Sequence, residues 1–122
     1  MKALLALFGA VQLVLGLLLW ITPGFFFDEI GPYGARNDHY MGDLGTWYIA
    51  LGVAALVAVR RPRWRVPVLA LALVQNTLHV LNHAIDVGEA DPEWLGPVNL
   101  VLIALTSVLL AWMLNAARDP AR

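Results

Sequence analysis

The sequence predicts an all-α protein, a bundle of four transmembrane helices, and three observations predict it. The chain is 60% hydrophobic and only 14% charged, whereas a soluble domain is about 45–50% apolar and about 25% charged. Its apolar residues form four runs of about twenty, the length at which a helix crosses ~30 Å of hydrocarbon. The runs lack the strand-like alternation of a membrane barrel, so helices are the remaining way to satisfy the backbone hydrogen bonds in lipid. We therefore expect one integral membrane domain over residues 1–122.

The first two helices are expected at residues 3–22 and 38–59. The first follows Lys2 and resembles a signal peptide, but its apolar body is long and no A-x-A site follows it, so we interpret it as a retained helix that ends at Pro23-Gly24. Asn37 or Asp38 is a suitable N-cap for the second helix. Between them, residues 25–27 are three phenylalanines that predict an interfacial, re-entrant or lid-like loop.

The last two helices are expected at residues 66–87 and 96–116. Pro67 lies in the first turn of the third helix, where a missing N–H costs little. Asp91-Pro92 and Gly96-Pro97 bracket the start of the fourth helix. The boundaries of all four helices thus coincide with residues that interrupt helices.

The charged residues predict the orientation of the bundle. The link between the second and third helices contains four arginines: Arg60, Arg61, Arg63 and Arg65. Basic loops remain in the cytoplasm, so both termini are expected there as well, and the link is also expected to bind anionic lipid to some extent. The other two loops hold eight of the nine acidic residues. We therefore expect a multi-pass protein of the inner (cytoplasmic) membrane with two short acidic extracytoplasmic loops.

The composition excludes several functional classes. The net charge is −1, so no basic field attracts nucleic acid. The chain has no cysteine, which excludes disulfides, thiolate nucleophiles, iron–sulfur ligation and covalent c-type haem. Any metal ion must be held by histidine, carboxylate or amide oxygen.

The third helix carries a polar stripe. At about 100° per residue, six polar side chains fall within an arc of roughly 120°: Gln75, Asn76, His79, Asn82, His83 and Asp86. Ionisable groups are costly in lipid. The stripe is therefore expected to face the interior of the bundle and to line a pocket near the extracytoplasmic surface.

The second helix adds a matching pair. His39 and Asp43 are four residues apart and share a helix face. All three histidines of the chain thus lie near the outer ends of two helices that are joined through the cytoplasm. Glycines line the first two helices: Gly9 and Gly16 on the first, and Gly42 and Gly45 on the second. Such residues let membrane helices approach closely.

These residues are candidates for a metal site. His39, Asp43, His79 and His83 would be the ligands, a set that suits zinc and, with other geometries, copper or iron. Asn76, Asn82 and Asp86 would orient the imidazoles through their free N–H groups. Haem b is a weaker alternative, in which His39 and one histidine of the third helix would face each other across the ring.

Several functions remain open. A bound metal could lower the pKa of a water for hydrolysis or carry redox chemistry on a lipophilic substrate, with Asp43 or Asp86 as the catalytic proton acceptor. The chain could instead be a non-catalytic accessory or assembly subunit of a larger membrane complex, or a homo-oligomer. A cation or proton path is a third alternative, with few polar residues in the inner half to support it. Lastly, the polar residues could only join helices by hydrogen bonds.

Two stretches carry a resemblance to a family. They are GPYGARNDHYMGDLGTWYIALG, with His39, Asp43 and Gly45, and LHVLNHAIDVG, with His79, Asn82 and His83. In these the sequence resembles small four-helix bacterial membrane proteins of the DoxX-like kind. The resemblance implies a bundle with a site on the extracytoplasmic side, and a link to redox and quinone-associated complexes. It implies no particular reaction, and the lack of cysteine argues against thiol chemistry.

Overall fold

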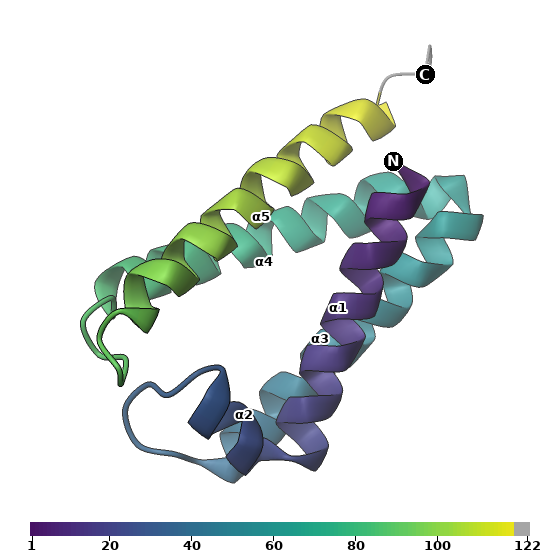
Figure 1. Ribbon diagram of the computed structural model, residues 1–122. Coiled ribbons are helices and arrows are strands. Elements are labelled where there is room, and N and C mark those ends of the chain that lie inside the picture. The colour runs from purple at the N-terminus through teal and green to yellow at the C-terminus, as the bar shows by residue number, and fades with distance from the viewer. Residues whose placement is uncertain (119–122) are drawn as a thin grey trace. The chain divides into compact units, whose positions relative to one another are not determined.

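The computed structural model describes residues 1–118 and is all-helical over them (Figure 1). This part of the chain contains five α-helices, one short 3-10 helix and no strand. In chain order the elements are α1 (Lys2–Ile21), α2 (Pro23–Glu29), α3 (Asp38–Arg60), η1 (Pro62–Trp64), α4 (Arg65–Ile85) and α5 (Leu95–Arg118). The prediction of an all-α fold is confirmed.

Four helical segments among the described residues are long and apolar enough to cross a membrane. They are Lys2–Ile21, Asp38–Arg60, Pro62–Ile85 and Leu95–Arg118, of 20 to 24 residues each. Each overlaps one predicted span, so the prediction of four helices of membrane-spanning length and composition is confirmed. The third helix ends at Ile85, two residues before the predicted end, and Asp86 therefore lies just beyond it. The orientation and the identity of the membrane remain predictions.

The segment between the first two spans contains a short helix that the sequence did not indicate. α2 begins at Pro23, whose fixed φ suits the first position of a helix. The Phe26 N–H donates to the Thr22 carbonyl at 3.1 Å, so α2 follows α1 with little interruption. Phe25 is 54% exposed, and the interfacial position of this segment remains a prediction.

The contacts of the chain divide it into two units, Met1–Trp64 and Arg65–Arg122. They are called unit 1 and unit 2. In unit 1, α1 packs along α3; in unit 2, α4 packs along α5 (Figure 1).

Unit 1 is held together by glycines. A Cβ atom added to Gly16 would lie 2.8 Å from the carbonyl oxygen of Gly45, and one added to Gly52 would lie 2.8 Å from that of Gly9. The two helices are therefore antiparallel and touch backbone to backbone at two places, two turns apart. The glycine contacts predicted for the first two spans are confirmed at Gly9, Gly16 and Gly45. Gly42 instead lies beside Trp20 with room for a side chain.

Unit 2 is held together by a buried asparagine. The Asn76 side-chain amide Nδ2 donates to the Ile103 carbonyl oxygen and to Ser107 Oγ, both at 2.8 Å. Asn76 is only 6% exposed, so water does not compete strongly for these bonds. α4 and α5 also contain buried apolar side chains, among them Leu69, Leu110 and Met113. α4 and α5 run antiparallel (Figure 1).

Candidate metal-binding residues

The two histidines of α4 lie against each other. His79 and His83 are one helical turn apart, and their ring centroids are 4.7 Å apart with the ring planes tilted by 60°. α4 continues to Ile85, so both positions lie within regular helix and share a face. Both side chains are half-buried. The i, i+4 spacing therefore yields two neighbouring imidazoles in unit 2.

Asn82 and Asp86 form a second pair at the end of α4. Asn82 Nδ2 donates to Asp86 Oδ2 at 3.2 Å, and the Asp86 backbone N–H donates to the Asn82 carbonyl at 3.1 Å. The carboxylate is thus tied back to the last turn of the helix although α4 ends one residue before it. This places a half-buried carboxylate three residues after His83.

The remaining polar residues of the stripe have different surroundings. Asn76, predicted to orient an imidazole, uses its amide Nδ2 to join α4 to α5. Asn76 thus joins two helices by hydrogen bonds, which is the alternative role that the sequence left open for these polar residues. Gln75, its neighbour, is half-buried.

The histidine of unit 1 is in a more open environment. His39 and Asp43 lie in the first turns of α3, with His39 Nε2 3.6 Å from Asp43 Oδ2. Their side chains are 82% and 68% exposed. The His39 ring also lies 5.9 Å from that of Tyr40. The predicted i, i+4 pairing is therefore present, at the surface of unit 1.

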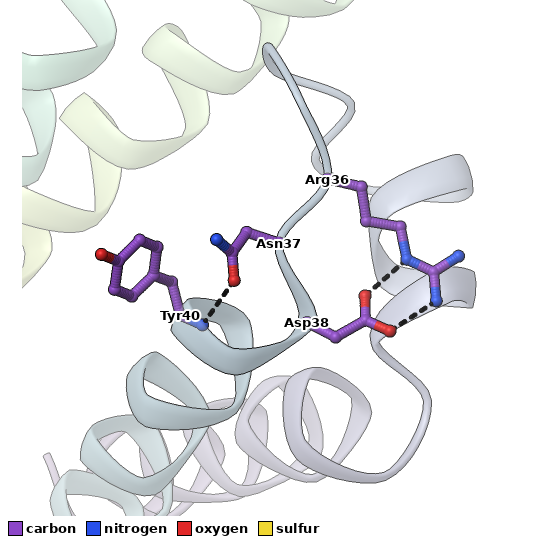
Figure 2. A network of polar contacts seen from close by, with 4 residues as sticks. All are labelled: Arg36, Asn37, Asp38 and Tyr40. Atoms are coloured by element: carbon purple, nitrogen blue, oxygen red, sulfur yellow. Dashed lines mark hydrogen bonds and ion pairs between the residues drawn. The ribbon is translucent and has the colours of Figure 1, made fainter.

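A short polar network fixes the start of α3, as Figure 2 shows. Asn37 Oδ1 accepts the Tyr40 backbone N–H at 3.2 Å, so Asn37, one of the two predicted candidates, is the N-cap. Arg36 donates from Nε to Asp38 Oδ1 at 2.6 Å and from Nη2 to Asp38 Oδ2 at 2.9 Å. These hydrogen bonds raise the pKa of Arg36 above its usual value, so the guanidinium stays charged.

Arg36 also connects α3 to α2. A Cβ atom added to Gly24 would lie 2.8 Å from Arg36 Nη1, so the guanidinium packs over the first turn of α2. This role was not predicted from the sequence, although Arg36 is the sole Lys or Arg of the two acidic loops. Its signal was an opposite charge two residues away at a helix start.

The structure brings the candidate ligands together in pairs. Over residues 1–118, neither unit by itself contains three or more histidine or acidic side chains placed to share a metal ion. His39 and Asp43 belong to unit 1, whereas His79, His83 and Asp86 belong to unit 2. Their predicted convergence on one ion remains a prediction.

No family model, curated protein or solved structure matches the chain. The resemblance to DoxX-like proteins therefore also remains a prediction.

Proposed function

We propose that this chain is a multi-pass protein of the inner membrane that binds a transition-metal ion through His79 and His83, near the extracytoplasmic surface. The observation that supports it is the pair of imidazoles one turn apart on α4, with ring centroids 4.7 Å apart. Two histidines at i and i+4 are a common way for a helix to hold a metal. Ionisable groups in a membrane-spanning helix are also functional candidates by default.

The proposed ligand set includes His39 and Asp43. Two imidazoles alone leave coordination positions open, and zinc, copper and iron commonly take additional histidine or carboxylate ligands. The His39–Asp43 pair supplies one of each on a single helix face. Asn82 and Asp86 would then orient the imidazoles of α4 from outside the metal shell.

Such a metal would support chemistry on a lipophilic substrate. A metal-bound water has a lowered pKa and becomes a nucleophile near neutral pH. Asp86 or Asp43 would accept its proton. Redox chemistry is the corresponding role if the metal is copper or iron.

Metal analysis of the purified full-length protein tests the proposal. We expect zinc, copper or iron near one equivalent per chain, and a loss of most of it in His79→Ala and His83→Ala. Thr77→Ala is the matched control, because Thr77 is an exposed polar residue of α4 outside the predicted polar stripe. His39→Ala and Asp43→Ala test the additional ligands separately. Metal well below stoichiometry in the unmodified protein would rule out the site.

A second candidate function is that of an accessory or assembly subunit. α5 exposes one apolar face, formed by Val101, Leu102, Leu105 and Val108, each more than half exposed. In a membrane such a face contacts lipid or another protein chain. Copurification from native membranes distinguishes the two functions. A stable partner lost in the histidine variants, with unchanged metal content, would favour the accessory role over metal binding.

A further inference from the structure

Unit 1 has an apolar groove with a single charged residue in its wall. Its volume is about 480 Å³, and it is lined by Ala6, Val53, Leu56, Val57, Val59 and Arg60. Val53 is 50% exposed and Val57 36%, so this wall is accessible from outside the unit. The groove is shallow and largely open to the outside of the unit.

The groove extends from a charged end into the apolar part of the span. Its α3 residues cover positions 53–60, about 10 Å along the helix axis. Arg60 is the last residue of α3 and lies at one end of this stretch. Lys2 lies one turn before Ala6 on α1, so it shares the helix face that lines the groove.

The charge around this end has one sign. Arg61 and Arg63 follow Arg60 directly, and no Asp or Glu occurs in residues 1–27 or 44–64. Trp64, which is 43% exposed, is a residue type that anchors at the membrane–water interface. The groove thus has an apolar wall and a basic end, and an interfacial residue type follows four residues after Arg60 in the chain.

We propose that this groove binds an anionic phospholipid of the surrounding leaflet, with one acyl chain along the apolar wall and the phosphate on Arg60. A guanidinium can hold two phosphate oxygens at once. A zwitterionic headgroup offers the same phosphate but adds a quaternary ammonium, which the basic end of the groove repels, so a net anionic lipid is favoured. Anionic lipids populate the cytoplasmic leaflet, where basic loops are expected to lie. The proposal shares this orientation with the proposed function but uses none of the candidate metal ligands.

Native mass spectrometry of the full-length protein tests the inference. The probes are palmitoyl-oleoyl phosphatidylglycerol and its phosphatidylcholine counterpart, added to protein in detergent. We expect retention of phosphatidylglycerol over phosphatidylcholine, and a loss of about fivefold in that preference in Arg60→Gln. Arg118→Gln is the control, since it removes the same charge at the end of α5, outside unit 1. Equal retention of the two lipids, or equal losses in both variants, would overturn the proposal.

Filling the groove tests the acyl-chain part. Val57→Phe is expected to reduce retention of both lipids several-fold, whereas Val101→Phe on the exposed face of α5 is not. Because the chain has no native cysteine, a photoreactive label on Val57→Cys reports what lies in the groove. Cross-links to lipid support the proposal. Cross-links to protein alone, or unchanged lipid retention in Val57→Phe, contradict it.

Discussion

Unit 1 and unit 2 are both pairs of antiparallel helices, but they are held together in different ways. In unit 1, glycines of α1 and α3 bring two backbones into direct contact. In unit 2, a buried asparagine side chain crosses from α4 to α5. Because lipid tails are as apolar as leucine, apolar burial drives little association between membrane helices. Close packing and interhelical hydrogen bonds are the two remaining sources of association. Unit 1 shows the first at its glycines, and unit 2 shows the second at Asn76.

The difference predicts that the two units respond to opposite kinds of substitution. Unit 1 should be sensitive to added volume, since the groups around its glycines include backbone atoms that have little room to move. Unit 2 should be sensitive to the removal of polar atoms. The histidines of the two units also differ, in exposure: His39 is 82% exposed, whereas His79 and His83 are half-buried.

The largest effect is expected from Gly16→Ala. The new Cβ atom would lie 2.8 Å from both the Gly45 carbonyl oxygen and the Ile49 backbone nitrogen, so the helices must separate. Overpacking of this kind costs about 1–3 kcal/mol. Gly42→Ala is the matched control, because its nearest neighbour, Trp20, would be 3.8 Å away; better helix propensity should make this variant neutral or up to ~1 kcal/mol more stable. Unfolding of the protein in mixed micelles measures both, and equal signs for the two variants would refute the glycine contact.

A smaller effect is expected from Asn76→Ala. It removes the hydrogen bonds to Ile103 and Ser107, and polar contacts between membrane helices are worth about 0.6–2 kcal/mol. A double-mutant cycle with Ser107→Ala isolates the side-chain bond, for which we expect a coupling energy of about 0.6 kcal/mol. Zero coupling would mean that the asparagine does not hold unit 2 together through Ser107.

The smallest effect is expected from Arg36→Gln. Arg36 and Asp38 are exposed, and ion pairs in water contribute little to global stability. The substitution should instead loosen α2 and the first turn of α3, so that hydrogen exchange accelerates there while the α1–α3 contact stays protected. Arg36→Lys should behave similarly, because an ammonium cannot form the two-pronged contact with Asp38. Loss of protection throughout unit 1 would show that this network is part of its core.

The spans were predictable because each is a long apolar run between interrupting residues, and the Asn37 cap was predictable because its signal is local. Features that depend on which residues of another helix lie opposite were not predictable. Gly52 was missed since its role depends on which residue of α1 lies opposite, and Asn76 was assigned to the metal site because its partners on α5 cannot be identified from a helical projection of α4. The same reason leaves the relation between His39 and the α4 histidines a prediction.

The glycine spacing determines where His39 lies along the helix axis relative to α1. The contacts pair Gly9 with Gly52 and Gly16 with Gly45, and both helices carry these glycines seven residues apart. Sliding one helix by two turns would leave a single glycine facing another, so only one alignment keeps both contacts. That alignment sets how far the first turn of α3 projects beyond the end of α1. The level of the His39 imidazole relative to α1 is therefore determined by positions that have no side chain, two to four turns away along the helix.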